Sequence, residues 1–398
     1  MKNLPMILCT GCAACADKCP KQCIKMSENE EGFLYPQLDV TECIDCGLCE
    51  KVCPALEVHN QKREPLQIYV GYNTDEAVLL NSSSGGVFTL LGQQIIQAGG
   101  VVFGARFNDQ WEVVHDYTET IDGLVAFRGS KYVQCRMDHT YRQAEFFLKK
   151  GKPVLFSGTP CQIAGLRKFL GKIYDNLILV DFICHGVPSP GIWRRYLSEV
   201  IGSHKEKYHV KNNTVHIREI SFRNKSTGWK RFSFSLSVVE QEKVLVINEP
   251  LDKNDYLKGF LANLYLRPSC HNCNDKGWNS GSDITIADAW GIGRYMPDFD
   301  DDKGCSIMSV LTPKGAHILE ILKETGLMRV RQIDEDFIKT HNPAAFISAK
   351  PHKKRKAFFK YIRTGKNFHS VINACLPQPT YFDKIIWSIK KRLKNYVK

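Results

Sequence analysis

No stretch of eighteen or more consecutive apolar residues occurs in the 398-residue sequence, so no transmembrane helix is predicted. The apolar stretch before Cys9 is too short for a secretory signal, and we therefore expect a cytoplasmic protein. The glycine pattern G-x-G-x-x-G and the P-loop pattern are also missing, so these two nucleotide-binding fingerprints do not apply. The length, with 43% hydrophobic and 24% charged residues, predicts an ordinary globular chain of about two to three domains.

Cysteine, by contrast, is abundant, with sixteen residues. Because the cytoplasm keeps thiols reduced, this number favours metal binding or redox chemistry over a disulfide framework. Positive charge is concentrated at the C-terminal end, where residues 350–398 hold fourteen Lys and Arg against one Asp. The net charge of +12 therefore belongs to this tail, and the rest of the chain is close to neutral.

Residues 9–20 and 43–54 repeat the pattern C-x2-C-x2-C-x3-C-P. In two-cluster ferredoxins the first three thiolates of such a run hold one 4Fe-4S cluster, and the fourth ligates the other cluster. Zinc is the alternative, but zinc sites prefer two separated C-x2-C pairs, often with histidine. Cys23 lies outside both runs and is interpreted as a small buried apolar residue. On the ferredoxin rule, the first cysteine set is Cys9, Cys12, Cys15 and Cys53, and the second cysteine set is Cys19, Cys43, Cys46 and Cys49.

The pattern of apolar residues predicts an α+β (mixed α/β) fold, with a bacterial-ferredoxin-like domain in front of a larger α/β body. Alternation around residues 29–32 predicts a hairpin between the two cysteine runs. Residues 153–171 read as a buried strand, a turn and a helix, and a second apolar strand then ends on Cys184. Together they predict a parallel βαβ unit in the body. Residues 214–248 alternate and predict an antiparallel meander.

Four further cysteines lie in the body and form the body cysteine set. Cys161 and Cys184 are expected at the carboxyl edge of neighbouring parallel strands, where open α/β sheets place their sites. Cys270 and Cys273 form a C-x2-C pair, which spacing alone leaves open between zinc binding, redox chemistry and a structural role. The four residues could assemble a third four-thiolate site, and the spacing does not decide whether they do.

Ser82–Gly86, the serine turn, comes directly before a predicted helix over residues 87–98. Free backbone N–H groups at a helix start bind anions, so this turn could cradle a cofactor phosphate. A serine N-cap without any ligand is the alternative.

Six short motifs stand in an order that is specific as a set, although each is weak alone. They are SSSGG at 82–86, GSKYVQ at 129–134, GTPCQIAGL at 158–166, CHGVPS at 184–189, SCHNC at 269–273 and DITIADAWG at 283–291. With the twin cysteine run in front, the chain resembles the family of coenzyme F-420 hydrogenase/dehydrogenase beta subunits over roughly residues 5–345.

The resemblance implies non-covalently bound FAD in the body and a third 4Fe-4S cluster held by the body cysteine set. With the basic tail added, we expect four parts: a two-cluster ferredoxin-like domain at 1–60, a body part with the flavin turn at 66–150, a body part with the third cluster and the meander at 151–345, and a basic tail at 346–398. The residues that the resemblance implies for the flavin site are Ser83, Ser84, Gly85, Gly86 and Lys131.

Flavins exchange hydride with organic molecules and single electrons with iron–sulfur clusters. The resemblance therefore implies an oxidoreductase that passes electrons between a redox protein such as ferredoxin, the clusters, FAD and a small-molecule substrate. Members of this family use the deazaflavin coenzyme F-420 or chlorophyll pigments, and others accompany surface-polysaccharide genes, so the substrate stays open. The alternative is an electron-transfer subunit that wires a partner catalytic protein and has no substrate of its own. No catalytic residue is assigned; His185 is a candidate proton donor, with a purely hydrogen-bonding role as the alternative.

The basic tail ends in a predicted amphipathic helix at 381–398, with apolar residues every fourth position and Lys and Arg around them. Such a helix suits an anionic membrane surface, here the inner face, or an acidic redox partner. The alternative is a helix packed on the body with a solvated basic face. Nucleic-acid binding is not expected, because no recognition motif accompanies the charge.

Overall fold

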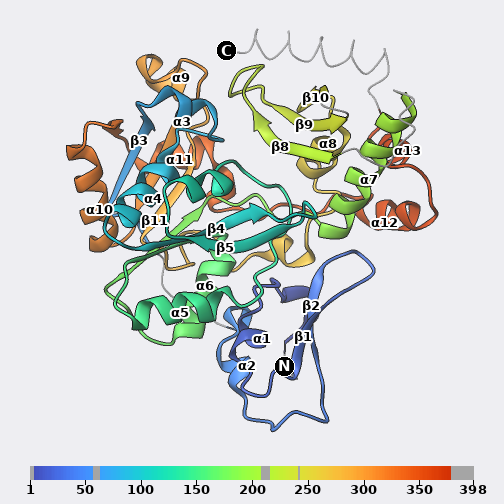
Figure 1. The fold of residues 1–398 in the computed structure, drawn as a ribbon, viewed down its shortest axis with the longest axis horizontal. Helices are drawn as coiled ribbons and strands as arrows, with labels where there is room; N and C mark the ends of the chain where they lie inside the picture. Colours follow the sequence, from blue (N-terminus) through green and yellow to red (C-terminus); the bar gives the residue numbers. More distant parts are fainter. Residues whose placement is uncertain (1–3, 57–62, 208–215, 241–242, 378–398) are drawn as a thin grey trace, which may run out of the picture.

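The structure is a computed structural model that describes residues 4–56, 63–207, 216–240 and 243–377. A small N-terminal domain lies against one side of a larger body (Figure 1). The body holds an eight-stranded sheet and a separate three-stranded sheet. Within these residues no helix combines the length and the apolar character that crossing a bilayer requires.

The N-terminal domain consists of one hairpin and several very short helices. Its strands pair antiparallel from Ile24 with Leu38 to Glu28 with Leu34, which confirms the predicted hairpin. The tight connection is stabilised by Asn29, whose Oδ1 accepts hydrogen bonds from the backbone N–H groups of Glu31 and Phe33. In chain order the elements are η1 (Met6–Leu8), α1 (Ala14–Lys18), β1 (Ile24–Glu28), β2 (Leu34–Leu38), α2 (Leu48–Lys51) and η2 (Pro54–Leu56).

The large sheet has the strand order β13-β3-β12-β11-β7-β6-β4-β5. Its centre, β11-β7-β6-β4, is parallel, and both flanks are antiparallel. The strands are β3 (Gln67–Asn73), β4 (Val101–Phe107), β5 (Val113–Thr118), β6 (Val154–Gly158), β7 (Leu177–Phe182), β11 (Ile284–Asp288), β12 (Ser306–Val310) and β13 (Met328–Gln332). The mixed α/β prediction is therefore confirmed.

The predicted βαβ unit is the centre of this sheet. Strands β6 and β7 pair in parallel and are joined by α6 (Pro160–Leu170). This helix begins with a capping box, in which the Gln162 side chain accepts a hydrogen bond from the backbone N–H of Thr159. Pro160 at its first position fits the start of a helix. The helix therefore starts at a fixed residue, which places Cys161 in its first turn.

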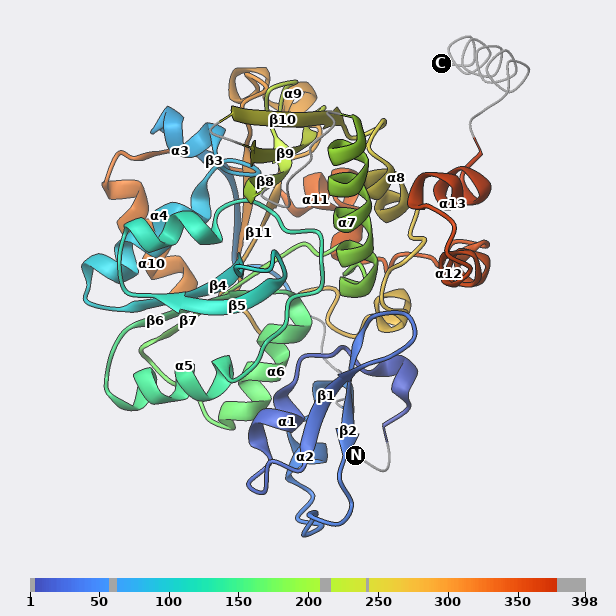
Figure 2. The same cartoon turned by 45° about the vertical axis from the view of Figure 1, so that its right-hand side comes forward.

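Helices cover both faces of the large sheet. On one face α4 (Val87–Gln97) and α10 (Pro313–Glu324) bury an apolar layer against the strands. On the other face α5 (Thr140–Lys149) and α6 lie between the sheet and the N-terminal domain (Figures 1 and 2). The remaining elements around the sheet are α3 (Glu76–Leu80), η3 (Asp122–Phe127), α9 (Ile292–Tyr295), η5 (Pro297–Phe299), α11 (Glu335–His341) and η6 (Pro343–Ala345).

The predicted meander forms the second sheet, in the order β10-β9-β8 with antiparallel pairing throughout. It packs on a core that is rich in aromatic residues, including Trp193, Phe222, Phe234 and Tyr256. The elements of this part are α7 (Pro190–Lys207), β8 (His216–Asn224), β9 (Ser233–Glu240), β10 (Lys243–Pro250), α8 (Asp255–Leu261), η4 (Pro268–Asn272), α12 (Arg355–Arg363) and α13 (Phe368–Cys375).

The first part of the basic tail returns to the N-terminal domain. The Arg355 guanidinium forms a two-pronged ion pair with the Glu31 carboxylate, and Arg363 pairs with Glu30. Helix α12 also buries Phe358 in the aromatic core, so this basic segment packs on the protein. The amphipathic helix predicted at 381–398 lies outside the described residues.

Candidate functional site

The first cysteine set comes together at the boundary between the N-terminal domain and the body. All four of its residues line one narrow cavity. Cys12 and Cys15 are buried, and burial raises the pKa of Cys12 to about 12 and that of Cys15 still further. Neighbouring thiolates add to both shifts, because four potential negative charges are held together. Four gathered sulfurs, of which Cys12 and Cys15 are poorly stabilised as free anions, fit a metal cluster, which binds cysteine as thiolate.

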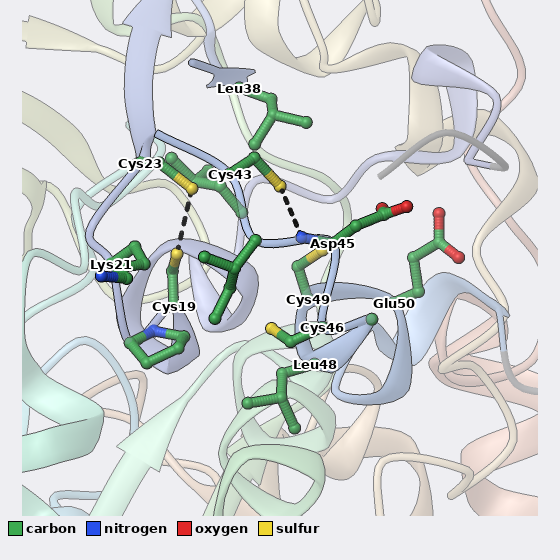
Figure 3. Close-up of a pocket in the computed structure, with 14 residues that line it drawn as sticks. Cys19, Lys21, Cys23, Leu38, Cys43, Asp45, Cys46, Leu48, Cys49 and Glu50 are labelled. Atoms are coloured by element: carbon green, nitrogen blue, oxygen red, sulfur yellow. Dashed lines mark hydrogen bonds between the residues drawn. The ribbon is translucent and has the colours of Figure 1, made fainter. Parts of the chain in front are cut away.

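The second cysteine set lines a larger cavity of about 210 Å3 on the outer part of the domain. Figure 3 shows Cys19, Cys43, Cys46 and Cys49 around it. Cys46 is exposed, whereas the first three cysteines of the N-terminal run are buried. The second set is therefore the one that a molecule in solution can approach.

Cys23 also lines this second cavity, which the sequence pattern did not indicate. The residue is buried as expected, and its sulfur lies 3.4 Å from the sulfur of Cys19 (Figure 3). The interpretation as a small buried residue is therefore incomplete, because this thiol contacts a predicted cluster ligand.

Left-handed backbone residues explain how each cysteine run curves around its cavity. In the first run, Gly11 (φ 71°) and Ala13 (φ 63°) flank Cys12. In the second run, Asp45 (φ 52°) and Gly47 (φ 69°) occupy the corresponding positions. Such reversals aim successive N–H groups inward, as when Asp45 donates its N–H to the Cys43 sulfur at 3.4 Å. The shared geometry follows from the repeated sequence.

The body cysteine set converges from three separate segments. Cys161 lies in the first turn of α6, Cys184 lies just after β7, and Cys270 and Cys273 lie in and after the short helix η4. The pKa values of Cys270 and Cys273 are raised to about 12, mainly by burial, with a contribution from Cys184 to both and from Asp275 to Cys273. The pKa of Cys161 is raised by burial first and then by Asp275 and Cys273. The structure thus places Cys184 within electrostatic reach of each of the other three cysteines.

Hydrogen bonds fix the loops that carry this set. The backbone N–H of Val187 donates to the Cys270 sulfur at 3.4 Å, and the N–H of Cys273 donates to Ser348 Oγ at 3.0 Å. Lys276 donates to the carbonyl oxygen of Cys184 and brings a positive charge beside the set. No three His, Cys, Asp or Glu side chains in the described ranges converge tightly enough to hold a single metal ion. In a 4Fe-4S cluster each thiolate binds a different iron, so the four sulfur atoms lie farther apart than they do around a single zinc ion.

His185 forms a hydrogen bond to another side chain, which is in keeping with the hydrogen-bonding alternative to a proton donor. Its Nε2 lies 2.6 Å from the side-chain oxygen of Asn263. Burial lowers the pKa of this imidazole, so the neutral form is favoured. The structure therefore shows a side-chain pair rather than a contact with a cysteine sulfur.

The serine turn and the segment that contains Lys131 lie side by side, although they are far apart in sequence. The backbone N–H of Ser130 donates to Ser83 Oγ at 2.6 Å. Ser84 Oγ donates to the carbonyl oxygen of Cys305, and Gly85 donates its N–H to Ser306 Oγ. Gly86, with φ of 75°, is the N-cap of α4. The two predicted halves of the flavin site are thus adjacent.

Within the described part of the chain, the Lys131 side chain forms hydrogen bonds only with neutral carbonyl oxygens. Its Nζ donates to the carbonyl oxygens of Arg128 and Gly129 at 2.8 and 3.2 Å. Burial lowers the pKa of Lys131 to about 7. Among the described residues it forms no ion pair, so an anion at this position would supply the missing counter-charge.

Two cations beside the serine turn were missed from the sequence. Arg223 and Lys225, both near the end of β8, donate to the carbonyl oxygens of Ser83 and Ser84 respectively. Arg223 also forms an ion pair with Asp288 at 2.9 Å. Burial lowers the pKa of Lys225 to about 7. The alternating pattern that contains Arg223 and Lys225 predicted only a strand. Nothing in that pattern indicated that the two cations would lie beside the serine turn.

The fold and the two N-terminal cysteine sets define an iron–sulfur protein with a redox role. Comparison with family models identifies the domains that these residues resemble. Residues 8–56 match the 4Fe-4S dicluster domain, and residues 151–336 match the C terminus of the coenzyme F420 hydrogenase/dehydrogenase beta subunit. The chain therefore joins a domain for two 4Fe-4S clusters to the C-terminal domain of that family of beta subunits, as the motif order predicted.

Two curated relatives and one solved structure illustrate these matches. A component of the F420H2 dehydrogenase of Methanosarcina mazei is 21% identical over 184 residues, which are 44% of this chain and 51% of that protein. The 7Fe ferredoxin of Hydrogenibacillus schlegelii is 37% identical over 65 residues, which are 16% of this chain and 77% of the ferredoxin. The F420-reducing [NiFe] hydrogenase complex from Methanosarcina barkeri contains a chain with 17% identity and a TM-score of 0.43, covering 79% of this chain and 94% of that one. The alignment with the dehydrogenase component thus spans about half of that component's length.

Proposed function

We propose that this protein is a flavin-dependent oxidoreductase with three clusters, in which electrons pass between a redox protein, the two N-terminal clusters, a body cluster and FAD. The body cysteine set would hold the third 4Fe-4S cluster. The supporting observation is that helix α6 carries one residue of the body cysteine set and also contacts the first cysteine set. Cys161 lies in its first turn, and Gly165, four residues later on the same face, lies against Cys12 of the first cysteine set.

Exposure supports an order for the path. The second cysteine set opens to solvent through Cys46, whereas Cys9, Cys12 and Cys15 of the first set are buried and Cys12 packs against α6. A protein partner would therefore exchange electrons at the second set, and the first set would connect to the body cysteine set.

The serine turn and its surrounding cations support an FAD site. Backbone N–H groups at the start of α4 and the half-buried ammonium of Lys131 suit a diphosphate. Ser83, Ser84, Gly85 and Gly86 would form the turn around it. FAD, when bound, would exchange hydride with an organic substrate and single electrons with the clusters.

An electron-transfer subunit without a substrate of its own is the second candidate. It is favoured by the name of the relative from Methanosarcina mazei, which is one subunit of a dehydrogenase. The two candidates share the clusters and the flavin and differ in what reoxidises them. Reduced protein that is reoxidised by a small molecule, such as a deazaflavin, supports the enzyme; reoxidation by a protein partner alone supports the electron-transfer role.

Anaerobic purification followed by iron and flavin analysis tests the proposal. Three clusters predict about twelve irons per chain together with one flavin. Cys270→Ser should remove about four of these irons, because it breaks the body set. Cys375→Ser is the matched control, since Cys375 is a buried cysteine of α13 that belongs to none of the three sets. About eight irons without flavin in the unchanged protein, or an unchanged iron count in Cys270→Ser, would contradict the proposal.

A further inference from the structure

We propose that Arg267 is a positioning residue for electron transfer, which supplies the counter-charge for the cluster on the first cysteine set and ties that set to the body cysteine set. This proposal deepens the proposed function, and its second half rests on it. Nothing in the sequence pattern singled out this arginine.

Arg267 is completely buried, and its guanidinium contacts both the backbone and the sulfur of Cys9. Its Nε donates to the carbonyl oxygen of Cys9 at 2.7 Å, and one terminal nitrogen lies 3.6 Å from the Cys9 sulfur. The same nitrogen donates to the carbonyl oxygen of Leu34, and the other donates to Gln134 Oε1 at 2.9 Å. The guanidinium also lies 4.1 Å from the centre of the Tyr35 ring. All these contacts hold one orientation of the side chain.

The charge of Arg267 has no carboxylate partner in the part of the chain that the structure describes. A buried cation without a partner is strongly disfavoured, so such an arrangement calls for a nearby negative charge. The Cys9 sulfur, one ligand of the first cysteine set, lies against the guanidinium and can carry this charge as a thiolate. A 4Fe-4S cluster with four thiolates carries net negative charge and would therefore complete the ion pair.

Space for the guanidinium is provided by Gly11, within the first cysteine run. A Cβ atom on residue 11 would lie 2.8 Å from a terminal nitrogen of Arg267 and 2.5 Å from Nε2 of Gln134. The left-handed backbone of Gly11, with φ of 71°, independently disfavours a side chain. The cysteine run and the arginine are therefore fitted to each other.

The backbone of Arg267 belongs to the body cysteine set. Its carbonyl oxygen accepts a hydrogen bond from the N–H of Cys270. Its own N–H donates to the carbonyl oxygen of Val187, and the N–H of Val187 donates to the Cys270 sulfur. Arg267 thus contacts the first cysteine set with its guanidinium and the body cysteine set with its backbone.

A positive charge and a hydrogen bond at a cluster sulfur favour the reduced form, which carries one more negative charge. Arg267 should therefore raise the reduction potential of the cluster on the first set, and leave that on the second set largely unchanged. An electron that enters at the exposed second set would then be drawn toward the body.

The test is a redox titration of the full-length protein, followed by electron paramagnetic resonance, together with iron analysis. Arg267→Gln removes the charge and should shift the midpoint potential of one N-terminal cluster to more negative values. Arg267→Lys keeps the charge and should retain most of the wild-type potential. Arg355→Gln is the matched control: Arg355 also donates to the neighbouring carbonyl of Leu266 but pairs with Glu31, and its loss should shift neither potential.

Gln134→Glu provides a second variant if Arg267→Gln does not fold. This nearly isosteric change places a carboxylate on the guanidinium without removing it, and should also make one N-terminal potential more negative. Unchanged potentials in Gln134→Glu, or equal shifts of both N-terminal clusters in Arg267→Gln, would overturn the proposal. Loss of the third cluster is separately visible as an iron count of about eight, so failure of the proposed function and failure of the role of Arg267 are distinguishable.

Discussion

Gly165 on α6 lies against Cys12 of the first cysteine set, and Gly165→Ala tests this contact. An added Cβ would lie 3.1 Å from the Cys12 sulfur and 2.8 Å from the Tyr141 hydroxyl oxygen. That hydroxyl donates to the carbonyl oxygen of Gln162 at 2.9 Å, so it cannot move without losing a buried hydrogen bond. Overpacking of this kind costs about 1–3 kcal/mol, against which alanine gains about 1 kcal/mol in helix propensity.

Gly202→Ala is the matched control for this prediction. Gly202 also lies within a helix, α7, but no atom lies within 4 Å of its added Cβ. This variant should therefore show the propensity gain of about 1 kcal/mol alone. Guanidinium unfolding under anaerobic conditions, followed by circular dichroism, should place Gly165→Ala about 1–3 kcal/mol below Gly202→Ala. Equal stabilisation of the two variants would refute the packing of α6 on Cys12.

Two further predictions concern charges. Burial lowers the pKa of Lys131 to about 7, below its value in the unfolded chain, so the unfolded chain binds more protons above that pH. The free energy of unfolding of flavin-free protein should therefore rise from about pH 7 to about pH 9, and Lys131→Met should reduce that rise; an unaltered pH dependence would contradict the burial of this charge. The ion pair of Arg355 with Glu31, whose side chains are 13% and 26% exposed, should couple α12 to the hairpin by about 1–3 kcal/mol. A double-mutant cycle with Arg355→Gln and Glu31→Gln measures this coupling, and additive effects would show that the pair does not hold the two elements together.

Local patterns carried most of what the sequence could predict. The two cysteine runs, the hairpin around residues 29–32 and the βαβ unit depend on neighbouring residues, and their elements are present in the structure. The motif order also predicted the family correctly. The proposed ligands of the body set rested on the resemblance, because their spacing alone left the chemistry open.

Contacts between distant segments could not be predicted in the same way. Arg267 meets Cys9 from 258 residues away, and Arg223 meets Ser83 from 140 residues away. Each is a single arginine in an ordinary local pattern, and only the folded chain shows that it is buried. The basic run near residue 355 was interpreted from its charge alone, which could not reveal that its partner is the acidic turn of the hairpin.

The central claim is that electrons reach the flavin through the body cysteine set. Its most direct test is rapid mixing of oxidised full-length protein with a reduced ferredoxin, with cluster and flavin absorbance followed separately in wild type and in Cys270→Ser. The account predicts that the N-terminal clusters are reduced in both proteins, and that the flavin is reduced rapidly only in the wild type. Equally rapid flavin reduction in Cys270→Ser, with the flavin still bound, would contradict it.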